Sequence, residues 1–134
     1  MNENAFDTEV RRSLVRHGFK SCTSTELLDR WSFFVGECEE GYAWTIYEFD
    51  DELSVRDYLE TLLGDPVLTE FSALLDLRNQ VTRLDQRFKR LLQPGVIRPS
   101  PWITWWRMGV LKSSGEEYRS DMASRYSITV DAVE

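Results

Sequence analysis

The densest group of side chains that could carry binding chemistry lies between residues 102 and 107. It consists of Trp102, Trp105, Trp106 and Arg107. Tryptophan and arginine stack on planar ligands and on bases, and both are among the residues that dominate protein interfaces. Large rings also close the ends of helical bundles, although tryptophan is seldom completely buried. The cluster is therefore a candidate interface, a candidate ligand pocket or a part of the core.

A second candidate is the arginine stripe, which consists of Arg83, Arg87 and Arg90. Steps of four and three residues place these side chains on one face of a helix, where like charges repel by about 0.2–0.5 kcal/mol per pair. Such a stripe favours an anionic neighbour, which is either a phosphate, a nucleic acid or an acidic protein, or an acidic face of the same chain. The acidic residues expected on an antiparallel neighbouring helix are Glu48, Asp51 and Glu52.

Catalytic and metal chemistry have little support in the sequence. His17 with Cys22 or Cys38 is the only combination that resembles a thiol nucleophile and its base, and no orienting motif accompanies it. The acidic cluster at residues 50–52 lacks the Glu-x-x-His pairs of carboxylate metal sites in helical bundles. Common nucleotide, calcium and hydrolase motifs are absent from the sequence. We therefore expect no catalytic site, no metal and no cofactor, and we favour a role other than catalysis.

The charge of the chain bounds its partners. The net charge is −7 and the pI is near 4.8, which disfavours binding to nucleic acids or to anionic membranes. Residues 37–76 hold twelve acidic residues against the single Arg56, and residues 78–112 hold eight basic residues against the single Asp85. The chain is thus an acidic block followed by a basic block.

Length and cysteine content favour one domain in a reducing compartment. A chain of 134 residues has the usual size of a single domain, so we expect one helical domain over residues 1–134. Only Cys22 and Cys38 are present, and their spacing fits no metal or redox motif. The sequence shows neither a secretory signal nor an apolar run of the roughly 20 residues that a membrane span requires. We therefore expect a cytoplasmic protein without membrane contact.

The elements that would position these side chains are amphipathic helices. Thr23 and Glu26 form a capping box, and apolar residues then recur in steps of three and four from Leu27 to Leu53, which predicts a long helix over residues 24–53. The alternative is a β-hairpin over residues 31–49, because that stretch is rich in strand-favouring residues. A separate short helix is expected to begin near Ser54.

A second long helix is predicted over residues 67–92, where apolar residues alternate three and four apart from Leu74 to Leu91. The sequence therefore predicts an all-α fold, an elongated helical bundle with two long antiparallel helices (24–53 and 67–92) and shorter helices packed along them. If the hairpin over residues 31–49 formed instead, the fold would be α+β.

For function, we expect a protein-interaction module, namely a small acidic partner, adaptor or inhibitor. Self-association is part of this expectation, because an acidic and a basic block can pair between two copies as readily as within one chain. The alternative from another class is a small-ligand-binding or sensor domain that uses the tryptophan cluster with Arg107. An enzyme without a recognisable motif and a nucleic-acid binder that uses the arginine stripe are less favoured.

Overall fold

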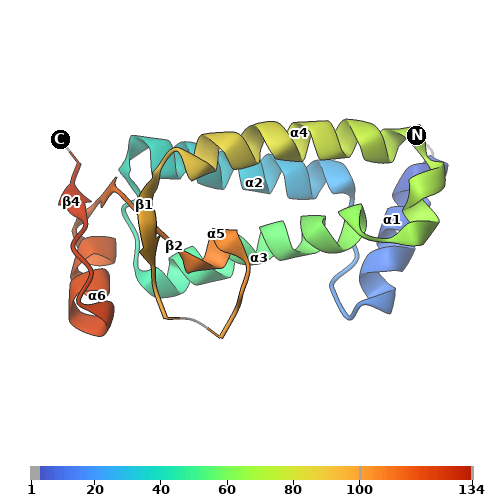
Figure 1. Ribbon diagram of the computed structural model, residues 1–134. Helices are drawn as coiled ribbons and strands as arrows, with labels where there is room; N and C mark the ends of the chain where they lie inside the picture. The colour runs from blue at the N-terminus through green and yellow to red at the C-terminus, as the bar shows by residue number, and fades with distance from the viewer. Residues whose placement is uncertain (1–3, 100, 134) are drawn as a thin grey trace.

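Helices dominate the computed structural model, which describes residues 4–99 and 101–133 (Figure 1). The helices of these residues are α1 (Ala5–Arg16), α2 (Ser24–Gly41), α3 (Ile46–Leu63), the 3₁₀ helix η1 (Pro66–Glu70), α4 (Ser72–Lys89), α5 (Trp105–Met108) and α6 (Glu116–Tyr126). The strands form two short pairs, β1 (Leu92–Ile97) antiparallel to β2 (Gly109–Leu111) and β3 (Ser113–Ser114) parallel to β4 (Asp131–Ala132). The all-α fold class is confirmed.

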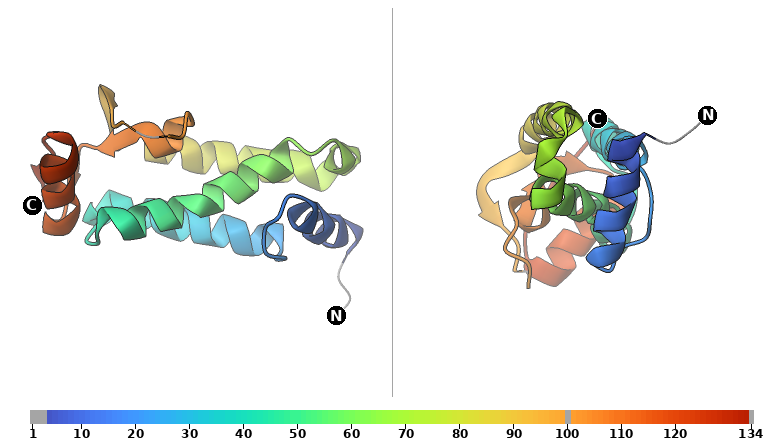
Figure 2. Two further views of the ribbon diagram at one scale, coloured as in Figure 1. Left: turned by 90° about the horizontal axis from the view of Figure 1, so that it is seen from below. Right: turned by 90° about the vertical axis from the view of Figure 1, so that its right-hand side faces the viewer.

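Three helices of 18 residues each, α2, α3 and α4, lie side by side along the long axis of an elongated molecule. Along this axis α3 runs opposite to both α2 and α4 (Figure 1). α1 packs across one end of the three helices and α6 across the other (Figure 2). Every α-helix described contributes side chains to one cluster of buried apolar residues, so the long helices and the end helices share a core.

The continuous helix predicted over residues 24–53 is wrong, because the chain turns between α2 and α3. α2 ends at Gly41, whose φ of +107° lies in the left-handed region that glycine adopts at little cost. α3 begins after Thr45, whose hydroxyl accepts the amide hydrogen of Glu48 at 3.3 Å. Tyr42 and Ile46, on either side of the turn, are both buried. The spacing of apolar residues is therefore the same as in an unbroken helix and does not indicate the turn.

The helix boundary predicted at Ser54 is also wrong. The Ser54 hydroxyl donates back to the Asp51 carbonyl at 2.6 Å instead of capping a new helix, and α3 continues to Leu63. The alternative hairpin over residues 31–49 does not form, because residues 31–41 and 46–49 are helical. Strand-favouring residues there are buried in a helical core, and packing outweighs their intrinsic preference.

The second predicted helix exists with shorter bounds than residues 67–92. Its heptad positions are buried in α4, namely Leu74, Leu77, Val81, Leu84 and Phe88. Phe71 has an extended backbone, which separates α4 from η1. At the other end the chain enters β1 at Leu92, and β1 and β2 then bring α5 against α3.

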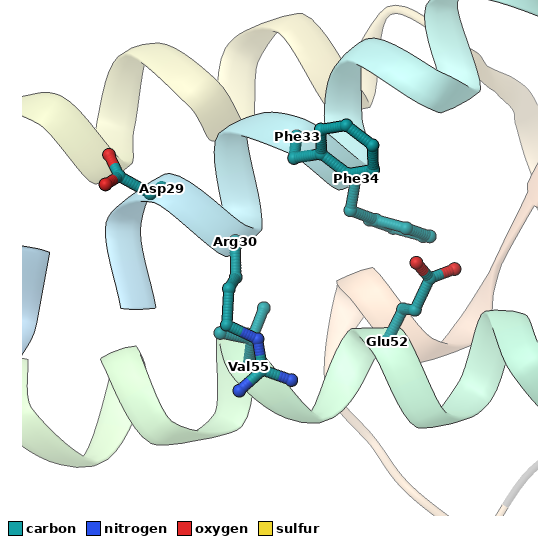
Figure 3. Close-up of a pocket in the computed structure, with 6 residues that line it drawn as sticks. All are labelled: Asp29, Arg30, Phe33, Phe34, Glu52 and Val55. Carbon is teal, nitrogen blue, oxygen red and sulfur yellow. The ribbon is translucent and has the colours of Figure 1, made fainter. Parts of the chain in front are cut away.

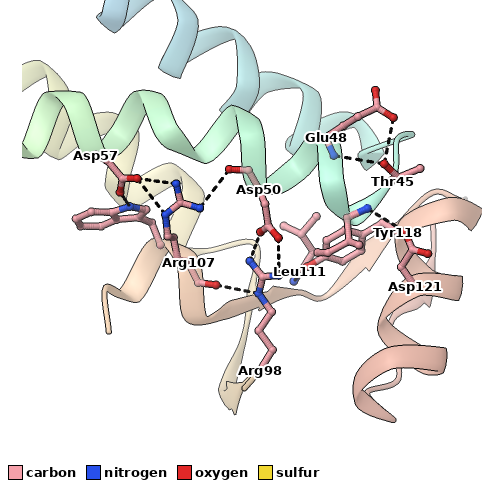
Figure 4. Close-up of polar contacts among 11 residues, drawn as sticks. Thr45, Glu48, Asp50, Asp57, Arg98, Arg107, Leu111, Tyr118 and Asp121 are labelled. Carbon is pink, nitrogen blue, oxygen red and sulfur yellow. Dashed lines mark hydrogen bonds and ion pairs between the residues drawn. The ribbon is translucent and has the colours of Figure 1, made fainter. Parts of the chain in front are cut away.

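Three buried arginines attach the second half of the chain to α3. Arg98, next to β1, forms a bidentate ion pair with Asp50, and its Nε donates to the Arg107 carbonyl at 2.9 Å (Figure 4). Arg107 of α5 forms an ion pair with Asp57 in which Nε, at 3.0 Å, and Nη2 both donate to the oxygen Oδ2. Because Asp50 and Asp57 are seven residues apart, they lie on one face of α3 and receive both arginines.

The third arginine, Arg56, joins α3 to α4. Its Nε and Nη2 each lie 2.9 Å from a carboxylate oxygen of Asp85, and Asp85 also accepts the Trp31 indole hydrogen at 3.1 Å. The Arg56 guanidinium lies 4.3 Å from the centre of the Trp106 ring. A buried charge is tolerated only when it is paired and hydrogen-bonded, so this cluster fixes α2, α3, α4 and α5 relative to one another.

Replacing Asp85 by asparagine is expected to destabilise the fold strongly. Asp85→Asn preserves the size of the side chain but leaves the buried Arg56 without its main countercharge, which costs about 3 kcal/mol. The exposed ion pair between Arg87 and Glu39 provides the control, because Glu39→Gln should cost less than about 1 kcal/mol. Urea unfolding of both variants measures the two losses. Similar losses in the two variants would contradict the conclusion that the buried Arg56–Asp85 pair fixes the helices relative to one another.

A second prediction concerns the contact between α6 and the α2–α3 turn. A Cβ atom at Gly115 would lie 3.0 Å from the Tyr42 carbonyl oxygen and 3.1 Å from the Ala43 Cα, and backbone cannot yield as a side chain can. We expect Gly115→Ala to destabilise the protein by about 1–3 kcal/mol. Gly36→Ala is the control, because a Cβ atom at Gly36, inside α2, would meet no other atom within 4 Å, and it should stabilise by about 0.5–1 kcal/mol. Thermal unfolding compares the two, and opposite signs are expected.

Candidate protein interface

The residues of the tryptophan cluster differ in their exposure to solvent. Trp106 and Arg107 are buried, Trp105 is partly buried, and Trp102 is exposed. The Trp106 indole donates to Asp57 at 2.8 Å, and the Lys89 ammonium lies 4.5 Å from the centre of the Trp105 ring. Most of this cluster is therefore packed against α3 and the end of α4.

Arg107 is already engaged by neighbouring groups. Besides its pair with Asp57, its Nη1 donates to the Asp50 carbonyl at 3.2 Å (Figure 4). Its guanidinium also lies 4.4 Å from the centre of the Trp102 ring. A planar ligand between Trp102 and Arg107 would have to displace this stacking.

The arginine stripe lies on α4, where Arg83 and Arg90 are exposed and Arg87 is half-buried. Arg87 forms a bidentate ion pair with Glu39 of α2, with 3.1 Å between Nε and Oε2. The acidic neighbours predicted for the stripe were Glu48, Asp51 and Glu52, and for Arg87 this was wrong. The turn after Gly41 is the reason, since it reverses the chain and carries these three acids onto α3.

A surface that the sequence did not indicate lies along α2 and α3. Phe33 is 69% exposed, Tyr47 is 63% exposed and Trp44 is 48% exposed. Phe33 falls outside the apolar phase of α2, and Trp44 and Tyr47 flank the turn that was not predicted. Once Gly41 and the Thr45–Glu48 cap are recognised as a helix break, Trp44 and Tyr47 become surface candidates.

Two grooves run along this surface. The Phe33 groove has a volume of about 360 Å³ and is lined by Asp29, Arg30, Phe33, Phe34, Glu52 and Val55. Figure 3 shows Arg30 extending from α2 towards α3 and Glu52 extending from α3 towards Phe34. The Trp44 groove has a volume of about 340 Å³ and is lined by Trp44, Tyr47, Glu48, Asp51 and Glu52. Glu52 lines both grooves, so together they form one surface, which we name the α2–α3 face.

Glu52 is held in an unfavourable environment for a carboxylate. Burial raises the pKa of the Glu52 carboxyl, and the neighbouring Glu37 and Glu48 carboxylates raise it further. The Tyr42 hydroxyl donates to Glu52 Oε2 at 2.5 Å and partly opposes the rise. In turn, burial and the Glu52 carboxylate raise the pKa of Tyr42. The α2–α3 face thus gathers the Glu37, Glu48 and Glu52 carboxyls, and their proximity favours the protonated form of Glu52.

Neither cysteine has the setting of a nucleophile. Burial raises the pKa of the Cys38 thiol, and the Glu52 and Glu37 carboxylates add to the rise, so the reactive thiolate is disfavoured. Burial likewise raises the pKa of Cys22. Nδ1 of His17 lies 2.8 Å from the Ser13 carbonyl oxygen, a contact that ties the ring to its own helix.

Neither a metal centre nor a membrane span is found in residues 4–99 and 101–133. These residues include no group of three or more histidines, cysteines and acids placed to hold a metal ion. Within the same ranges there is no helix with the length and apolarity that crossing a bilayer requires.

Comparison with known proteins gives no guide to the function. No protein-family model, curated protein or solved structure matches the chain.

The raised pKa of Glu52 predicts a pH-dependent effect on stability. An acid with a higher pKa in the folded protein favours folding while protonated, so stability falls as pH rises from the ordinary value of about 4.3 through the raised value. We expect Glu52→Gln to be more stable than the wild type at neutral pH, with the difference vanishing below about pH 4.

Thermal unfolding at a series of pH values tests this prediction. Asp51→Asn removes one charge from an exposed neighbour and is the matched control, for which we expect a much smaller pH-dependent difference. A gain from Glu52→Gln that stayed constant down to acidic pH would show that ionisation of Glu52 is not its cause.

Proposed function

We propose that the protein is a protein-interaction module that holds a segment of a partner protein on the α2–α3 face. The observation that supports this most directly is the exposure of Phe33, Trp44 and Tyr47 beside two grooves that meet at Glu52. Grouped exposed apolar side chains mark interaction sites, and aromatic residues dominate the binding energy of interfaces. The grooves supply the recesses into which partner side chains fit.

The form of the surface favours a polypeptide over a small molecule. A small-ligand site is usually a cavity that encloses most of its ligand, with a few polar groups directed inward. Here the lining residues are spread along two neighbouring helices and the turn between them, from Asp29 to Val55. Such a surface can contact an extended segment or a helix of another chain.

The proposal keeps the role expected from the composition, a small acidic adaptor or inhibitor. It also keeps the cytoplasmic location, which is supported by the free thiols of Cys22 and Cys38. Self-association is the competing use of the same face, since Arg83 and Arg90 are exposed on α4 and could contact the acids of a second copy.

Selection of peptides from a random phage-displayed library tests the proposal. We expect enriched peptides that compete with one another for the wild type and bind Phe33→Ala at least about tenfold more weakly, because truncation removes a central aromatic contact. Leu75→Ala is the matched control, since Leu75 is a similarly exposed apolar residue of α4 outside both grooves. Titration by fluorescence anisotropy measures the affinities. Absence of enrichment, or equal loss in both variants, would overturn the proposal.

A further inference from the structure

We infer that the partner segment is basic and places arginine or lysine side chains in the Trp44 groove, where they meet Glu48, Asp51 and Glu52. This inference rests on the proposed function and adds the chemistry of the partner. Three of the five lining residues are acids, and the other two are Trp44 and Tyr47. A groove of aromatic rings and carboxylates matches a cation on both counts, because ring faces and anions both attract positive charge.

Glu37 adds a further carboxylate next to Trp44, one of the residues that line the groove. Its Oε1 is buried and has no hydrogen-bond partner among the described residues, while its Oε2 receives the Trp44 indole hydrogen at 3.4 Å. The Glu37 carboxylate lies close enough to Glu52 to raise that residue's pKa. The two carboxyls are also within hydrogen-bonding reach of each other, so a proton on Glu52 bridges them, and a bound cation would take the place of that proton. A guanidinium or ammonium group would supply both charge and hydrogen-bond donors.

The protein itself shows that this surface accepts a guanidinium. Arg125 of α6 lies over the Tyr47 ring, with 4.4 Å between its Cζ and the ring centre, and it donates to the Tyr47 hydroxyl. Arg125 therefore packs on the ring of Tyr47, one of the five residues that line the groove. Polypeptide cations fit better than a metal ion, because the described acids do not converge as metal ligands.

Charge complementarity selects the occupant. The Trp44 groove lies in the acidic block of the chain, whose other acids are partly used by Arg87, Arg98 and Arg107. Within the part of the chain that the structure describes, Glu48, Asp51 and Glu52 of the groove form no ion pair with an arginine or lysine. A neutral or acidic segment would leave the carboxylates desolvated and uncompensated, which weakens binding, whereas a basic segment would relieve their repulsion.

The test uses the peptides selected without bias by the wild-type protein. We expect these peptides to be enriched in arginine and lysine. Replacing a single basic residue that contacts the groove by glutamine should lower the affinity about tenfold. Their affinity should also fall severalfold as salt rises from about 50 to about 500 mM.

Matched variants of the protein complete the experiment. The double variant Asp51→Asn, Glu52→Gln should weaken the selected peptides about tenfold, whereas Glu116→Gln, Glu117→Gln, which removes the same charge from exposed sites on α6, should change the affinity less than twofold. Thermal unfolding confirms that both variants are folded.

The outcomes separate this inference from the proposed function. Peptides that need Phe33 but are neutral or acidic, or that bind independently of salt, would overturn the inference and leave the proposed function standing. Failure to enrich any peptide would remove the proposed function and the inference together. A dimer in sedimentation that dissociates in the Asp51→Asn, Glu52→Gln variant would assign the groove to a second copy and overturn the inference of a separate basic partner.

Discussion

The architecture depends on the requirement that buried arginines be paired. Arg56, Arg98 and Arg107 are all buried, and each has an aspartate partner, so the segments that carry these groups have little freedom to shift. α3 supplies one member of every pair. As a result α4, β1 and α5 are fixed to α3 by charge as well as by apolar contact. Other contacts adjust around this arrangement, including the cation–π contacts with Trp102 and Trp106.

This constraint also determines which side of α3 is left for function. Asp50 and Asp57 face the second half of the chain, where Arg98 and Arg107 lie. Glu48, Asp51 and Glu52 project from other sides of the same turns and line the grooves beside α2. The acidic residues of α3 are thus divided between a face that is neutralised within the protein and a face that is not. The second face is the one on which aromatic rings are exposed.

The sequence predicted what is encoded locally and missed what depends on distant partners. The cap at Thr23 forms as predicted, and the heptad residues of α4 are buried, because both signals reside in neighbouring side chains. The turn after Gly41 has a cap of the same pattern at Thr45, but buried Tyr42 and Ile46 continue the apolar phase through the turn, so the periodicity predicts an unbroken helix. The pairing of Arg98 with Asp50 joins residues 48 positions apart, and no local pattern encodes it.

The acidic and basic blocks of the sequence predict that ion pairs form, but not which residues form them. An acidic block and a basic block predict internal pairing, and Asp50, Asp57 and Glu39 do pair with arginines of the basic block. Composition cannot say which acids are left over, because that depends on the direction in which each helix presents them. Here the surplus gathers around Glu52, where burial makes ionisation unfavourable. These acids are the groups that the proposed basic segment would meet, and its positive charge would relieve the repulsion among them.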